Sequence, residues 1–243
     1  MIHNLSFLIG SGTGLIGLSI GLLLTYRLSN KGEKFEGVML AFTAGLMLSI
    51  VCFELLPKAF DIGGLYVGLI GIGIGILFVI LLEDYIDKSD RINENIDTIY
   101  FNRAILISIA FMVHNIPEGI AIGSMISLSI SEGLRFAFAI LIHNIPEGMI
   151  IALPLIKSRV KLPYIILIIF TISLSMGLGG IAGLSLSQIS KECISLSLAV
   201  AGGIMLYITS GEIIVKSMNH WKGRSITLSI ILGVILGIVL SYS

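Results

Sequence analysis

The hexapeptide His-Asn-Ile-Pro-Glu-Gly occurs twice in the chain, at residues 114–119 and 143–148. Each copy lies within a long apolar stretch, where a histidine, an asparagine and a glutamate are costly to bury unless they bind one another or a ligand. Imidazole, amide and carboxylate groups together form a donor set for divalent transition metals. Because the copies are 29 residues apart, we expect them on two neighbouring helices that share one site.

Helical spacing places the donors of each copy on one face, because residues i and i+4 of a helix lie above one another. The alternative is that histidine and glutamate pair with each other and simply fasten the helices. No lysine or arginine lies in the middle of either stretch, so two adjacent carboxylates would repel each other. A bound dication removes that conflict. The candidate metal ligands are His114, Asn115, Glu118, His143, Asn144 and Glu147.

Each copy also contains a proline and a glycine. Pro117 and Pro146 lack an amide hydrogen, so each removes one helical hydrogen bond and kinks its helix. Backbone groups freed in this way at membrane depth are tolerated only where they line a polar cavity. Gly119 and Gly148 leave space beside each glutamate. The motif therefore combines metal ligands, a helix kink and space beside the glutamate at one depth in the membrane.

The composition of the chain places these helices in a membrane. Of its 243 residues, 56% are hydrophobic and 12% are charged, and the mean hydropathy is +1.03, which is not the composition of a soluble core. A formal net charge of +0 gives no case for binding nucleic acid, and two cysteines fit no disulfide framework. The apolar runs are continuous rather than alternating, which excludes a closed barrel. Because backbone groups in lipid must pair internally, a helix bundle remains.

Since an apolar run of about 20 residues can cross a bilayer, we predict one all-α integral membrane domain over residues 1–243, with a cytoplasmic loop at 83–101. Eight spans are predicted, at about 5–26, 36–57, 63–82, 102–124, 131–155, 160–187, 194–215 and 225–242. Cytoplasmic loops carry an excess of basic residues. The connections after odd-numbered spans hold twelve lysines and arginines and the others hold three, so both termini should lie outside the plasma membrane.

A second self-similarity relates residues 44–58 to residues 202–216. Ala-Gly-Leu-Met-Leu in the first resembles Gly-Gly-Ile-Met-Leu in the second, and each is followed by a glutamate and, four residues later, a lysine. The offset is 158 residues throughout. In an eight-span count these two spans run in opposite directions, which is typical of inverted repeats with a polar site near the midplane. We expect a 3+2+3 inverted-repeat bundle, in which the first three spans match the last three and span four matches span five.

Three further residues within the repeats are candidates for an auxiliary role. Glu54 and Glu212 each have a lysine one turn further on. A snorkelling ion pair near the interface explains such a glutamate, and a gate or transit site for cations is the alternative. Met47 is either a packing residue or a soft metal ligand.

These segments resemble the ZIP (Zrt-, Irt-like) metal transporters, and most closely the bacterial ZupT-like branch. The resemblance covers nearly the whole chain. It rests on both hexapeptides, on residues 44–48 and on Glu-Leu-Leu-Pro at 54–57. It implies an eight-helix 3+2+3 carrier with extracellular termini, which imports divalent metal through a binuclear centre between spans four and five.

The resemblance also implies ligand sets. One metal would be bound by His114, Glu118, His143 and Glu147, and the other by Asn115, Glu118, Asn144 and Glu147. Met47 matches a position that can cap the first metal. The chain departs from the family at Met176, where span six often supplies a glutamate, because a thioether is a poor partner for a hard cation. The loop at 83–101 also lacks a histidine-rich stretch.

We expect import of zinc, with iron, manganese, cobalt and cadmium as further substrates, because mixed donors accept several divalent metals. No resident cofactor is expected. The expected partners are the metal ions, the lipid bilayer and a second copy of the chain. That homodimer is suggested only by the resemblance and by GxxxG spacings at Gly10 and Gly14, Gly17 and Gly21, and Gly233 and Gly237.

Other readings use the same residues. They are a channel-like metal facilitator, an exporter, a metal receptor without transport and an intramembrane metallohydrolase. Hydrolysis needs a metal with an open water position and a separate general base. The pattern His-Glu-x-x-His is absent, and asparagine takes the place of the base. We therefore do not expect an enzyme.

Overall fold

The computed structural model of the protein describes residues 2–28, 32–90, 111–112, 115–157 and 159–242, and the regular elements in these ranges are all helices. They are α1 (Ile2–Leu28), α2 (Glu33–Ile50), η1 (Val51–Leu55), α3 (Leu56–Asp90), α5 (Ile130–Lys157), α6 (Leu162–Ser187), α7 (Lys191–Ile208), η2 (Thr209–Ile213), α8 (Ile214–His220) and α9 (Arg224–Tyr242). A further helix covers residues 115–128. The predicted all-α class is confirmed.

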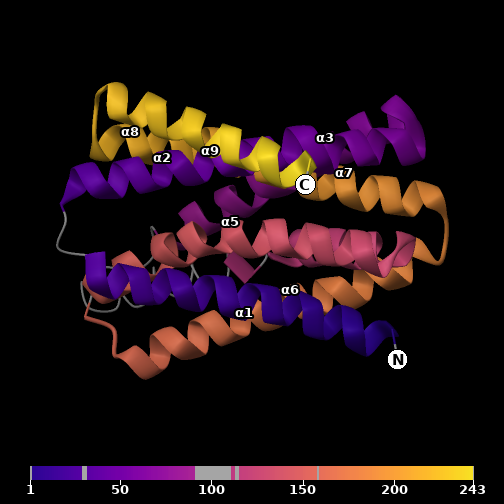
Figure 1. Ribbon diagram of the computed structural model, residues 1–243, viewed down its shortest axis with the longest axis horizontal. Helices are drawn as coiled ribbons and strands as arrows, with labels where there is room; N and C mark the ends of the chain where they lie inside the picture. Colours follow the sequence, from indigo (N-terminus) through magenta and orange to yellow (C-terminus); the bar gives the residue numbers. More distant parts are fainter. Residues whose placement is uncertain (1, 29–31, 91–110, 113–114, 158, 243) are drawn as a thin grey trace.

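The helices form two layers, one above the other in Figure 1. The upper layer packs α3 against α7 and α2 against α8 and α9, and the lower layer packs α1 against α5 and α6. The 115–128 helix belongs to the lower layer, because its glycines Gly119 and Gly123 contact α6. Contacts between α2 and α5 connect the two layers.

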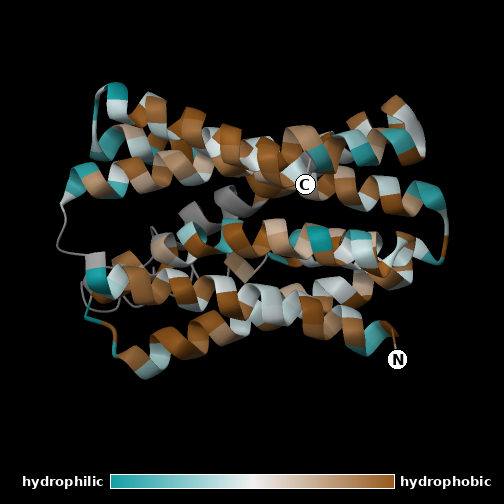
Figure 2. Ribbon diagram, viewed as in Figure 1, coloured by the Kyte–Doolittle hydropathy of each residue, from teal (hydrophilic) through white to brown (hydrophobic). Residues whose placement is uncertain are grey.

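Six helical stretches among the described residues are long and apolar enough to cross a membrane. One of them, Glu33–Leu81, has 49 residues, which is about 74 Å as a straight helix and more than twice the thickness of a bilayer core. Gly64 interrupts it with φ 78° and ψ 171°, a conformation that glycine adopts readily. This stretch therefore holds two candidate crossings. Figure 2 shows the largely apolar helices, with many hydrophilic residues toward the two ends of the bundle.

The first part of the predicted loop at 83–101 is helical. Residues 83–90 continue α3, and this segment contains no glycine or proline that would interrupt a helix. The rest of that loop, and the first part of the predicted span at 102–124, lie outside the described residues except for 111–112.

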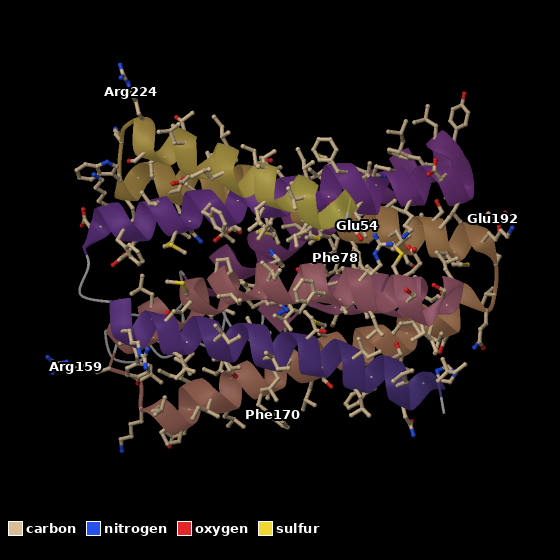
Figure 3. All side chains as sticks on the ribbon, in the orientation of Figure 1. Glu54, Phe78, Arg159, Phe170, Glu192 and Arg224 are labelled. Atoms are coloured by element: carbon tan, nitrogen blue, oxygen red, sulfur yellow. The ribbon has the colours of Figure 1, made fainter. Side chains whose placement is uncertain are left out.

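The two ends of the bundle are marked by charged residues. Arg159 and Arg224 lie at one end, while Glu192 lies at the opposite end, which is also where the chain begins (Figures 1 and 3). Arg159 follows α5, Arg224 opens α9 and Glu192 lies in the first turn of α7. Connections that the predicted topology assigns to the same side of the membrane therefore lie at the same end.

Glycines bring the helices of each layer into backbone contact. A methyl group on Gly45 of α2 would collide with the carbonyl oxygen of Ile230 in α9, and one on Gly203 of α7 would collide with the carbonyl oxygen of Ile72 in α3. Close approach of this kind drives helix association in lipid, where burial of apolar side chains contributes little. Among the described glycines, every contact of this kind joins helices of one layer.

The spacing of 158 residues found in the sequence recurs in this packing. Gly45 and Ile72 are each 158 residues before Gly203 and Ile230, so the two contacts are equivalent. The π-helical turns η1 and η2 begin 158 residues apart and contain the repeated glutamates. A π-turn holds one extra residue and is frequent at functional sites. The resemblance between the two segments therefore extends to an irregular local structure.

The three GxxxG pairs are used inside the chain. Gly10 and Gly14 contact α6, the pair at 17 and 21 contacts α5, and the pair at 233 and 237 contacts α2. These faces are covered by the protein's own helices. They therefore give no support to the expected homodimer, which then depends on the resemblance alone.

Candidate metal centre

Three of the predicted ligands meet between the 115–128 helix and α5. Glu118, His143 and Glu147 are at most 3% exposed, and one ligand atom from each lies within 4.8 Å of the others. The Nε2 atom of His143 is 3.0 Å from Oε1 of Glu118 and 3.9 Å from Oε2 of Glu147. The two hexapeptides thus contribute to one buried group of donors.

The local structure of α5 explains the placement of two of these side chains. The helix continues through Pro146 from Ile130 to Lys157, so His143 and Glu147 are one turn apart on the same face. Glu118, which forms a hydrogen bond with His143, lies on the neighbouring 115–128 helix and is 25 residues away in the sequence. Local spacing therefore fixes one half of the group, and helix packing brings in the other.

The two asparagines are also buried at this level, each 0% exposed. Asn144 donates from Nδ2 to the sulfur of Met176 in α6, at 3.9 Å. Within the described residues, Oδ1 of Asn144, both amide atoms of Asn115 and Nδ1 of His143 have no hydrogen-bond partner. Buried polar atoms are nearly always paired in folded proteins, so these atoms fit the donor set of a bound ligand.

His114 lies outside the described residues. The four-ligand set expected for the first metal is therefore represented by Glu118, His143 and Glu147, and the expected role of His114 stays a prediction.

The glycines of the two motifs do not simply leave room beside the glutamates. Gly119 packs against the carbonyl of Met176 in α6, and Gly148 packs against the carbonyl of Leu18 in α1. Met176 and Leu18 are themselves 158 residues apart. Each site helix is therefore held by a flanking helix at the level of its glutamate, through equivalent contacts.

The auxiliary candidates lie in the upper layer, apart from Met176. Met47 of α2 is 1% exposed, and its sulfur accepts a hydrogen bond from Oγ1 of Thr209 at 3.5 Å. Glu212 forms the expected ion pair with Lys216, with 2.9 Å between Oε2 and Nζ. Glu54 lies on the side of the upper layer that faces the lower one (Figure 3).

The lysine that follows Glu54 pairs elsewhere. Lys58 forms an ion pair with Glu132 in the first turn of α5, which joins the two layers. Lys58 and Glu132 are 74 residues apart, and no sequence pattern relates them. Only the crossing of the helices brings them together.

Comparison with known proteins identifies the family of this chain. The family described as ZIP zinc transporter matches residues 84–242. The zinc transporter ZupT of Stenotrophomonas maltophilia is 28% identical over 238 residues, which cover 89% of this chain and 87% of the relative. The zinc transporter ZIPB of Bordetella bronchiseptica is 26% identical over 234 residues, covering 91% and 75%. This chain belongs to the ZIP family, in its ZupT-like bacterial branch.

Proposed function

We propose that this protein imports zinc into the cytoplasm through a site between spans four and five, and that iron, manganese, cobalt and cadmium are further substrates. The buried group of Glu118, His143 and Glu147 carries this proposal. The relatives named zinc transporters support the choice of zinc.

The dimensions of the group suit a tetrahedral ion. Ligand atoms bound to zinc at about 2.0–2.2 Å are separated from one another by roughly 3.3–3.6 Å. The separations of 3.0 and 3.9 Å from His143 to the two carboxylates lie on either side of that range, so small side-chain movements would admit the ion. Two carboxylates also neutralise a dication, which favours its burial at membrane depth. His114 is proposed as the fourth ligand.

The proposed architecture is an eight-span bundle in a 3+2+3 inverted repeat, with both termini extracellular. Equivalent glycine contacts, and π-turns at the same spacing of 158 residues, support the relation between the outer groups of three spans. The equivalent packing of Gly119 and Gly148, 29 residues apart, supports the relation between the central two. The basic residues of alternate connections support the orientation.

Transport is proposed to follow alternating access, in which one group of helices moves against the other around the bound ion. The two layers are the natural groups, because the site lies in the lower layer. His143 binds metal only through a neutral ring, so acid is expected to weaken binding.

The test is metal uptake by the purified full chain in liposomes, followed with a metal-sensitive dye. His143→Ala and Glu147→Ala are expected to abolish zinc uptake. Glu192→Gln is the matched control, because it changes an exposed acid at the end of the bundle and should leave uptake unchanged. Normal uptake in both site variants would refute the proposal.

A channel-like facilitator would use the same residues but would differ in kinetics. Uptake that saturates with metal concentration and depends strongly on temperature supports the carrier. A rate that keeps rising with concentration supports a pore. Vesicles with a known orientation of the protein separate import from export.

A further inference from the structure

Met176 lies where α6 meets the two site helices and α1. It is 0% exposed, and its carbonyl oxygen faces Gly119 of the 115–128 helix. Its sulfur accepts the hydrogen bond from Asn144 of α5 and would be 3.4 Å from a methyl group on Gly14 of α1. The side chain therefore belongs to the wall of the metal centre, where its sulfur contacts the amide of Asn144.

This contact fixes the orientation of one amide. A thioether sulfur can only accept a hydrogen bond, so the NH₂ group of Asn144 must face it and the carbonyl oxygen must point away. That oxygen is buried, and no described residue donates to it. Asn115, the equivalent residue of the other motif, has no partner for either amide atom within the described part of the chain.

The repeat gives a reason for that difference. Leu18 lies 158 residues before Met176 and is also 0% exposed. A leucine offers no acceptor, whereas the methionine does. The sulfur of Met176 therefore orients Asn144, whereas the equivalent side chain, Leu18, has no atom that could accept a hydrogen bond.

The charge of the donor set limits how many ions it can hold. Glu118 and Glu147 carry two negative charges, while imidazole, amide and thioether donors are neutral. One dication is balanced by this set. A second would leave two uncompensated positive charges in apolar surroundings, where charge is expensive.

We propose that the centre binds one divalent ion per chain, and that Met176 is a positioning residue that turns the carbonyl oxygen of Asn144 toward this ion. This inference rests on the proposed function and replaces the two-metal arrangement that the family resemblance implies.

The test measures zinc bound per chain, and the affinity, on the purified full chain in detergent. Elemental analysis after equilibrium dialysis gives the stoichiometry, and titration calorimetry gives the dissociation constant. The wild type is expected to bind one zinc ion. Met176→Glu adds an anionic oxygen donor beside Asn144 and is expected to bind a second ion.

Met176→Leu keeps the volume of the side chain and removes the acceptor. It is expected to keep one ion but to bind it roughly 10- to 100-fold more weakly, as for other groups that orient a ligand. The same change should have no further effect in an Asn144→Ala background. Met205→Leu is the matched control, because it replaces a buried methionine of the upper layer, and should leave zinc affinity unchanged.

The outcomes separate this inference from the function on which it rests. Two zinc ions in the wild type, both lost in His143→Ala, would overturn the inference and leave the transport site standing. If zinc stoichiometry and affinity are unchanged in His143→Ala, the proposed function itself is refuted. Unchanged affinity in Met176→Leu, or an added effect without Asn144, would each refute the role of Met176. A single ion in Met176→Glu would refute the argument that charge limits the number of ions.

Discussion

The segments around η1 and η2 have similar local sequences and a π-turn at the same position but make different ion pairs. Lys216 pairs with Glu212 of its own helix, at 2.9 Å, with side chains 58% and 38% exposed. Lys58 pairs with Glu132 of α5, with side chains 28% and 39% exposed. One pair stays inside the upper layer, whereas the other crosses to the lower layer. A repeated sequence thus fixes the helix, while the partner of each charge depends on what lies opposite.

The largest effect on zinc uptake is expected at the glutamates of the two hexapeptides, which should be equivalent. Glu118→Gln and Glu147→Gln each remove one negative charge with little change in shape. Both are expected to reduce zinc uptake in liposomes by more than the roughly 10- to 100-fold typical of groups that only orient a ligand. Glu192→Gln serves as the control for an exposed glutamate outside the centre. Retained uptake in one of the two site variants would show that the halves are not equivalent.

The equivalent glycine contacts should respond alike to an added methyl group. Gly45→Ala and Gly203→Ala each drive a Cβ into a neighbouring backbone carbonyl, and overpacking of this kind costs about 1–3 kcal/mol. Thermal unfolding in detergent measures the loss. Gly73→Ala is the matched control, since nothing lies within 4 Å of its added Cβ. Clearly different losses at Gly45 and Gly203 would contradict the equivalence of the two contacts.

The smallest effect is expected at the ion pairs that break the symmetry. A double-mutant cycle on Lys58 and Glu132 should give a coupling of about 0.2–1 kcal/mol, and one on Lys216 and Glu212 about 0.3–0.5 kcal/mol. Both couplings should shrink in concentrated salt, because exposed charges are screened. If the coupling of Lys58 to Glu54 exceeds its coupling to Glu132, the proposed difference between the segments around η1 and η2 is wrong.

Local periodicity accounts for what the sequence could predict. The spacing of His143 and Glu147 places them on one face of any helix, and long apolar runs make the helices predictable. The repeat of 158 residues follows from similarity between two segments and anticipates where helices pack in the same way. These features depend on residues close together in the chain or on a recurring pattern.

The features that escaped prediction depend on distant contacts. The bond between Asn144 and Met176 and the pair of Lys58 with Glu132 arise where helices cross, and neither leaves a pattern in the sequence. The π-turns need the extra residue to be accommodated by neighbouring helices. The GxxxG pairs could equally serve a second copy or the chain itself, and only the packing of α1 and α9 decides between them.

Close contacts between a glycine and the backbone of a neighbouring helix join the helices within each layer. None of the described glycines makes such a contact between the layers. Interlocked backbones resist deformation, because a carbonyl pressed against a neighbouring Cα has no rotamer to change. A contact between the layers, the ion pair of Lys58 with Glu132, is made by side chains, which can switch rotamers. Mechanical compliance in this molecule is therefore concentrated in one plane, and shear along that plane is the least costly large deformation available to it.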